Sequence, residues 1–170
     1  MTKNRYLSHN FHLAEFINSP TATKLGIDNT PTRTVIRNLT KLCENVLQPV
    51  REAWGHPIII NSGYRCKELN KAVGGVWSSH HILGCAVDIR CYERKRNIEL
   101  WNIIIDNAKS WTQLLFEDTD GDFSNPEWIH VSWIENDLRN DIGRIAINPT
   151  SKRRTYTNLK AEKDEDLNDD

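Results

Sequence analysis

The segment from Ser79 to Asp88 constrains the fold of this chain more than any other. It holds two residue types that bind metals, His81 and Asp88, seven positions apart. An odd offset would place the two side chains on opposite faces of one straight strand. They can meet only if the chain turns between them, and Gly84 is where that turn is expected. Asp88 then lies on one face of the strand that follows the turn.

A later segment, Glu127–Trp133, supplies a third metal-ligand type. If this segment is a strand, His130 shares a face with Trp128 and can meet an aspartate on a neighbouring strand. Two histidines and one aspartate leave a fourth position for water, as in catalytic zinc sites. Each histidine alone is more often a surface or core residue than a ligand. The adjacent His80 and His81 point in different directions, so at most one of them is expected to bind.

The remaining pattern predicts an α+β fold in which two helices pack against a small, mostly antiparallel sheet. The first helix is expected from a cap at Thr30 to a stop at Gly55, with apolar residues at three- and four-residue spacing and a break or kink at Pro49. The second spans 93–108, and its inner face is expected to hold Ile98, Trp101, Ile104, Ile105 and Ala108. Shorter elements are expected at 57–61, 86–90, 113–116 and 128–133 as strands, at 66–73 as a helix, and at 144–147 as a last strand or an extended arm.

Two parts of the chain differ in composition. With 170 residues the chain can form a core without disulfides, and we expect one domain at 1–150. Residues 151–170 are highly charged and end in an acidic run, which indicates a disordered tail or one ordered by a protein partner. The cysteines lack CxxC spacing and are interpreted as reduced thiols; a Cys85 thiolate ligand is a minor alternative.

Charge and hydropathy exclude two partner classes. A net charge of -1 and a pI near 6.6 give no basis for a nucleic-acid or membrane surface. No apolar run approaches the roughly 18 residues of a spanning helix, so no membrane insertion is expected. The N-terminus has no apolar signal core either.

The motif Ser79-x-His81-x-x-Gly84-x-Ala86-x-Asp88, followed by Trp128-Ile129-His130-Val131-Ser132, resembles the zinc D-Ala-D-Ala carboxypeptidase family. That family includes phage L-Ala-D-Glu endopeptidases and shares its fold with hedgehog signalling domains. Upstream, Ser62-Gly63-Tyr64-Arg65 and the segment Asn70–Gly75 match the same family. The resemblance spans roughly Leu7 to Trp133 and is closest to single-domain phage and Bacteroides-type versions. It implies a hedgehog/D-Ala-D-Ala peptidase-like α+β fold.

The resemblance also implies roles for individual residues. It makes His81, Asp88 and His130 the ligands of a Zn²⁺ ion. It makes Arg65 the residue that pairs with a carboxylate of the peptide substrate. The planar guanidinium suits this role because it can hold a carboxylate with two hydrogen bonds.

The general base is open between two glutamates. The family often places an acidic residue three positions before the last histidine, which is where Glu127 stands. Strand parity puts Glu127 on the wrong face unless the chain bends at Pro126. Glu117, at the end of the preceding strand, is the competitor, and Glu127 is preferred. Ser79 and His80 are expected to contact substrate, with a bystander role for His80 equally open.

The function implied by the resemblance is a zinc metallopeptidase that hydrolyses peptidoglycan stem or cross-link peptides. It would act as a carboxypeptidase or an endopeptidase, and Trp77, Trp111 and Trp128 are candidates to wall its groove. The alternatives are a catalytically silent zinc-containing binding module and a phage virion structural component whose acidic tail docks on a partner. Without a signal peptide, we expect the protein in the cytoplasm of its producing cell or in a phage particle, and acting on the bacterial cell wall.

Overall fold

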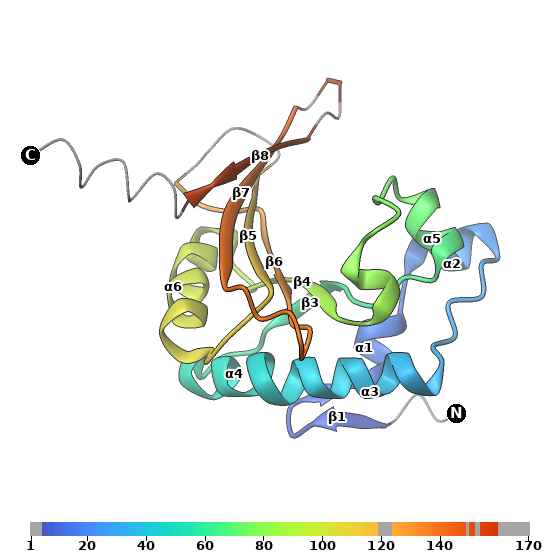
Figure 1. Cartoon of the computed structure of the whole chain (residues 1–170), viewed down its shortest axis with the longest axis horizontal. Coiled ribbons are helices and arrows are strands. Elements are labelled where there is room, and N and C mark those ends of the chain that lie inside the picture. The colour runs from blue at the N-terminus through green and yellow to red at the C-terminus, as the bar shows by residue number, and fades with distance from the viewer. Residues whose placement is uncertain (1–4, 119–123, 149, 152–153, 160–170) are drawn as a thin grey trace, which may run out of the picture.

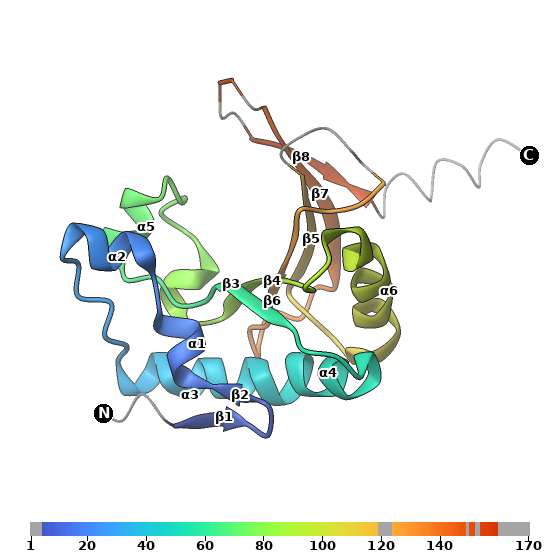
Figure 2. The same ribbon diagram turned by 180° about the vertical axis from the view of Figure 1, so that it is seen from behind.

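The computed structural model describes residues 5–118, 124–148, 150–151 and 154–159 (Figure 1). In these residues a mixed sheet of six strands has helix α6 (Asn97–Asn107) on one side. The segment that carries helix α5 (Lys67–Ala72) lies on the other side (Figures 1 and 2). A small sheet of two strands, β1 (Tyr6–Ser8) and β2 (Phe11–His12), lies beside the long helical segment described below.

The main sheet confirms the predicted α+β class and its mostly antiparallel character. Strands β5 and β7 run parallel, and the other neighbouring strands run antiparallel. The strand order is β3 (Ile59–Ser62), β4 (Ala86–Arg90), β6 (Trp128–Ser132), β5 (Gln113–Asp118), β7 (Asp141–Ile147) and β8 (Arg154–Asn158). The two strands that carry Asp88 and His130 are therefore direct neighbours near the middle of the sheet.

The long helical segment predicted before Gly55 is present but has three parts: α3 (Arg33–Leu42), the π-helical turn η1 (Cys43–Leu47) and α4 (Gln48–Trp54). Thr32, not Thr30, caps it, because the Thr32 side chain accepts the backbone N–H of Val35 at 3.3 Å. Pro49 has no N–H to donate, and the helix widens to the π turn just before it. Gly55 ends the segment with a φ of 69°.

The core lies between this helical segment, α6 and one face of the sheet. Alternate residues of the central strands are buried there: Val87, Ile89, Leu114, Phe116, Ile129 and Val131. On α6, Trp101 and Ile104 are buried as predicted, but Ile105 is 38% exposed and Leu100 is buried in its place. A 3₁₀ turn, η3 (Arg94–Arg96), precedes α6, so the helix proper begins later than the predicted 93.

The other short helices lie on the same side of the molecule as α5 (Figures 1 and 2). They are α1 (Leu13–Ile17), α2 (Pro20–Leu25) and the 3₁₀ turn η2 (His80–Leu83). Cys66 caps α5 with its sulfur, and all four cysteines are free thiols, in agreement with the sequence-based interpretation. Among the described residues, no helix is long and apolar enough to cross a membrane.

The C-terminal part of the chain differs from the prediction. Strand β8 falls within the stretch 151–170 that was predicted to be a disordered tail, yet it pairs with β7, Tyr156 lying opposite Ile145. The physical reason is a short run of β-formers, Thr155-Tyr156-Thr157, in a segment whose composition is otherwise mostly charged. The rest of the predicted tail, residues 160–170, lies outside the described residues.

Candidate metal centre

Three side chains from separate elements converge in front of the sheet. Asp88 on β4 lies directly opposite His130 on β6, and His81 reaches both from η2. His81 Nε2 lies 3.2 Å from Asp88 Oδ1 and 3.3 Å from His130 Nδ1, and His130 Nδ1 lies 2.9 Å from Asp88 Oδ1. Among the described residues, they form the one group of three His, Cys, Asp or Glu side chains close enough to share an ion. Cys85 is not part of this group.

Gly84 makes the turn that brings His81 back to Asp88, as the sequence predicted. It ends η2 with a φ of 70°, a left-handed conformation that favours glycine. A Cβ at this position would lie 2.8 Å from Val35 Cγ1, so the close approach to α3 also requires glycine. The His81 ring is then oriented by the Gly63 carbonyl, which accepts a hydrogen bond from Nδ1 at 2.7 Å.

The donor set fits a zinc ion. Ligand atoms about 2.0–2.1 Å from a tetrahedral zinc lie about 3.3 Å from one another, close to the separations among His81, Asp88 and His130. The Gly63 contact leaves the Nε2 lone pair of His81 facing the Asp88 carboxylate, an arrangement that a cation between them relieves. A backbone carbonyl on the far nitrogen is also the usual outer partner of a metal-binding histidine.

Asp88 is held as a carboxylate in this cluster. Burial raises its pKa, but the neighbouring His81 and His130 rings lower it by more, so the pKa lies well below the ordinary aspartate value. The ligand is therefore ionised at neutral pH, which is the form that binds a metal.

A cavity of about 540 Å³ opens over the three side chains. One wall is the segment from Val73 to His80, and the other is the face of β5, β7 and β8. The predicted substrate contacts Arg65, Ser79 and His80 line it. A volume of this size is typical of ligand-binding clefts.

Of the tryptophans proposed for the groove, Trp128 lines this cavity. Trp77 is 91% exposed and is not among the lining residues that the structure describes. Trp111 is buried, and its indole N–H donates to the carbonyl of Asp141 at 3.1 Å. Trp111 is thus a core residue. Of the three tryptophans, only Trp128 is among the residues that the structure describes as lining the cavity.

Arg65 is fixed beside the metal centre by the turn that carries it. The buried Asn29 side chain donates to the carbonyl of Tyr64 at 3.0 Å and accepts the N–H of Cys66 at 2.8 Å, so it brackets the arginine. Arg65 Nη1 lies 3.9 Å from Asp88 Oδ2. Burial lowers the pKa of Arg65 while Asp88 raises it, and a guanidinium stays charged in any case. Sequence reasoning missed Asn29, for which no local motif gives a signal.

Glu117 and Glu127 stand in different surroundings. Leu115 lies opposite His130, so Glu117, two residues further along β5, shares the face of the metal centre and lines the cavity. Its Oε2 is buried and accepts no hydrogen bond from the described residues. Glu127 is not among the described lining residues, and its carbonyl accepts the side-chain N–H of Asn97, at the start of α6 on the core side. The backbone N–H of Glu127 donates to the carbonyl of Glu117 at 2.9 Å, so the two glutamates are neighbours on paired backbone segments. Because Glu117 lines the cavity, it is a stronger candidate for the base than the sequence pattern alone suggested.

The ionisation of Glu117 reflects its burial. Burial raises its pKa, and the negative charge of Asp88 raises it further, while His130, Arg154 and Arg65 oppose the change. A carboxyl with a raised pKa in a cleft is a candidate proton carrier.

His80 faces the cavity although it is not part of the metal cluster. Its Nδ1 lies 3.0 Å from Ser132 Oγ, which also accepts the backbone N–H of Gln113 at 3.2 Å. Burial lowers the pKa of His80, and the nearby His130 lowers it further. The ring is therefore neutral at pH 7 and held by Ser132.

The structure adds residues from the C-terminal hairpin to the cavity wall. Arg139, Arg154 and Tyr156 line it together with Ile145. Sequence reasoning missed Arg154 and Tyr156 because it assigned 151–170 to a tail, and it gave Arg139 and Ile145 no role in the site. The β-forming residues Thr155, Tyr156 and Thr157 were the available signal for this strand.

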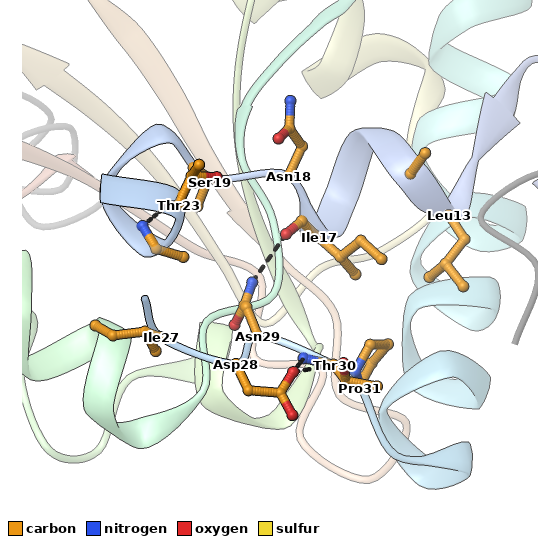
Figure 3. A pocket seen from close by; sticks show the side chains of 12 residues that line it. Leu13, Ile17, Asn18, Ser19, Thr23, Ile27, Asp28, Asn29, Thr30 and Pro31 are labelled. Atoms are coloured by element: carbon orange, nitrogen blue, oxygen red, sulfur yellow. Dashed lines mark hydrogen bonds between the residues drawn. The ribbon is translucent and has the colours of Figure 1, made fainter. Parts of the chain in front are cut away.

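A second cavity, of about 390 Å³, lies between α1, α2 and the chain that leads to α3 (Figure 3). Asn29 points from this chain to the carbonyl of Ile17, which accepts its hydrogen bond at 3.0 Å (Figure 3). Asp28 is the one ionisable residue in the described lining, and its carboxylate accepts hydrogen bonds from Thr30. The second cavity therefore has no group of catalytic or metal-binding side chains in its described lining.

Comparison with known proteins assigns the chain to a family. A search of curated proteins found no match. A family model described as Peptidase M15 matches residues 9–132, a range that contains His81, Asp88, His130 and Glu117 and ends before β7. Peptidase M15 is the family of zinc D-Ala-D-Ala carboxypeptidases that the motifs of the chain resemble. The match therefore supports a metallopeptidase activity for the chain. The chain belongs to the peptidase M15 family.

Proposed function

We propose that this chain is a zinc-dependent peptidase that hydrolyses stem or cross-link peptides of peptidoglycan. The observation that carries the proposal is the group formed by His81, Asp88 and His130, whose donor atoms have the mutual spacing of zinc ligands at the floor of a cavity. Membership of a peptidase family supports it.

In this proposal the three side chains would hold a zinc ion. Zinc, when bound, lowers the pKa of a coordinated water towards ~7 and polarises a carbonyl oxygen. Glu117 is the proposed general base, which takes a proton from the attacking water and then delivers it to the leaving amine. Its position on the cavity face, its buried Oε2 and its raised pKa support this role over Glu127.

Substrate binding is assigned to three residues of the cavity wall. Arg65 is proposed to hold a carboxylate of the peptide, since its fork of N–H donors matches a carboxylate. Ser79 and His80 are proposed to hydrogen-bond the peptide backbone. The neutral His80 ring, held by Ser132, is suited to such a contact because no charge is left without a partner when substrate is absent.

The test compares two variants on defined muropeptides, with products identified by mass spectrometry. Zinc-loaded wild-type protein is expected to cleave at one bond. Glu117→Gln is expected to retain zinc and to lose about 10²–10⁴-fold in rate, the usual contribution of a general base. Glu127→Gln is the matched control, expected to stay within a few-fold of wild type.

Two results would contradict this proposal in different ways. A large loss in Glu127→Gln with an active Glu117→Gln would return the base to Glu127. No cleavage of any muropeptide by the zinc-loaded wild type would instead favour a silent binding module. The product masses also separate carboxypeptidase from endopeptidase action.

A further inference from the structure

The hairpin of β7 and β8 lies beyond the matched range 9–132 but extends the face that carries the metal centre. The strand register runs from Asp88 through His130 and Leu115 to Gly143 and Asn158. Side chains at alternate positions of β7 and β8 therefore point to the same side as the proposed zinc ligands. The membership of the family does not account for this part of the cavity.

Tyr156 forms part of the wall because Gly143 leaves room for it. A Cβ at Gly143 would lie 2.3 Å from Cε2 of Tyr156, so the ring lies directly over the glycine. Tyr156 is 50% exposed and lines the cavity beside Ile145, its partner in the register. The hairpin thus presents an aromatic surface towards the metal centre.

Arg154 brings a positive charge to the same wall. Its Nη1 lies 3.9 Å from Oε2 of Glu117, and its side chain is 53% exposed. A guanidinium has five N–H donors in a planar fork, and one contact at this distance leaves it able to take a second carboxylate. Half-exposed and at the cavity edge, Arg154 is accessible to a bound peptide.

Arg139, a third guanidinium in the lining, is committed to neighbouring acids. It lies 3.0 Å from Asp137 and 3.4 Å from Asp141, so its charge is compensated within the protein. Arg65 and Arg154, in contrast, come from opposite ends of the strand order, after β3 and on β8. Strands β4, β6 and β5, which carry Asp88, His130 and Glu117, lie between them.

We propose that Arg154 and Tyr156 form a second carboxylate subsite, which selects acidic peptides that carry a free carboxylate in addition to the one held by Arg65. The inference rests on the proposed function and adds a substrate class to it. Arg154 supplies the charge and Tyr156 the apolar wall against which the peptide lies. Peptides in which that second carboxylate is amidated are poor substrates.

The experiment uses two stem peptides that differ only in this group, one with the isoglutamyl α-carboxyl free and one with it as the carboxamide. The kcat/KM ratio of the pair is measured for zinc-loaded wild type, Arg154→Gln and Arg144→Gln. Wild type is expected to prefer the free carboxylate by about tenfold or more, the size of a charge-assisted hydrogen bond. Arg154→Gln is expected to lose the preference by slowing on the carboxylate peptide alone.

Arg144→Gln is the matched control. Arg144 lies on β7 opposite Phe116 and Thr157, on the face away from the cavity, and its loss removes the same charge from the same hairpin. It is expected to keep the wild-type preference. If Arg144→Gln keeps the wild-type kcat/KM ratio and Arg154→Gln loses it, the effect comes from a local contact of Arg154 and not from the change in overall charge.

Three results would overturn the subsite. The first is a wild-type enzyme that cleaves both peptides equally well, and the second is an Arg154→Gln variant that keeps the preference for the free carboxylate. An equal loss on both peptides would assign Arg154 to Glu117 instead of to substrate. If wild type cleaves neither peptide, the proposed function fails, and the same pair is then titrated calorimetrically onto the intact protein. A tighter carboxylate complex that Arg154→Gln loses supports the subsite, and equal binding overturns it.

Discussion

The ionised form of Glu117, which the proposed mechanism needs, lowers the stability of the folded protein. Its carboxyl is buried, and burial together with Asp88 raises its pKa above the ordinary glutamate value. A group whose pKa is higher in the folded than in the unfolded state contributes its full stability below the unfolded pKa, and that contribution is lost as pH rises through the folded value. Above the unfolded pKa, Glu117 therefore disfavours the folded metal-free protein, at the position where the proposed mechanism needs a base.

This opposition predicts that Glu117→Gln stabilises the metal-free protein at pH 7 by a few degrees in Tm. The amide has the shape of the acid but no charge to desolvate. The gain is expected to shrink towards about pH 3, below the pKa of about 4.3 of an unfolded glutamate, where the wild-type carboxyl is protonated in both states. Differential scanning calorimetry of chelator-treated protein at the two pH values measures it. A variant that melts below wild type at pH 7 would contradict the interpretation.

At the scale of elements, Asn97 joins the start of α6 to the ends of two strands. It is fully buried, and its Oδ1 accepts the N–H of Cys91 at 2.8 Å, just after β4. Its Nδ2 donates to the carbonyls of Pro126 and Glu127, at 2.9 and 3.0 Å, just before β6. These contacts hold the residues just before β6 against the start of α6.

Asn97→Asp is expected to lower the free energy of unfolding by about 3 kcal/mol or more, because a buried carboxylate cannot donate to the two carbonyls. Urea denaturation measures the loss. Asn102→Asp, the same change at an exposed position of α6, is the control and should stay within about 0.5 kcal/mol of wild type. Equal stability of the two variants would show that Asn97 does not secure the strand ends.

At the scale of the whole molecule, the proposed zinc ligands come from η2, β4 and β6, and only the folded chain brings them together. A metal that binds the folded state alone stabilises it by mass action. The walls of the cavity come from both ends of the sheet, so both the matched region 9–132 and the hairpin beyond it line the cavity. A bound metal is therefore expected to stabilise the whole fold and not one element alone.

Zinc is expected to raise the Tm of chelator-treated wild type, with about 4.1 kcal/mol of stabilisation at a concentration 1,000-fold above Kd. His81→Ala and Asp88→Ala remove one ligand each and should show little response and little bound zinc by atomic absorption. His9→Ala, an exposed histidine far from the cluster in sequence, should respond like wild type. A full zinc response in both ligand variants would refute the assignment of the site.

Several features of this protein follow from the sequence alone. The α+β class, the strands at 86–90 and 128–133 and the Gly84 turn depend on local periodicity and backbone conformation. Each of these signals lies within a few neighbouring residues, so it can be recognised without knowing which distant residues the segment contacts in the fold. The family resemblance over the same segments pointed to the fold that the structure has.

Tertiary structure alone decided the rest. Glu117 lines the cavity because the pairing of β5 with β6 determines which side chains of β5 point to the metal centre. Leu100 replaces Ile105 in the core, and Arg154 and Tyr156 reach the site, because of how α6 packs and how β8 adds to the sheet. Such contacts join residues far apart in the chain, and their energy comes from packing and pairing that no local pattern encodes.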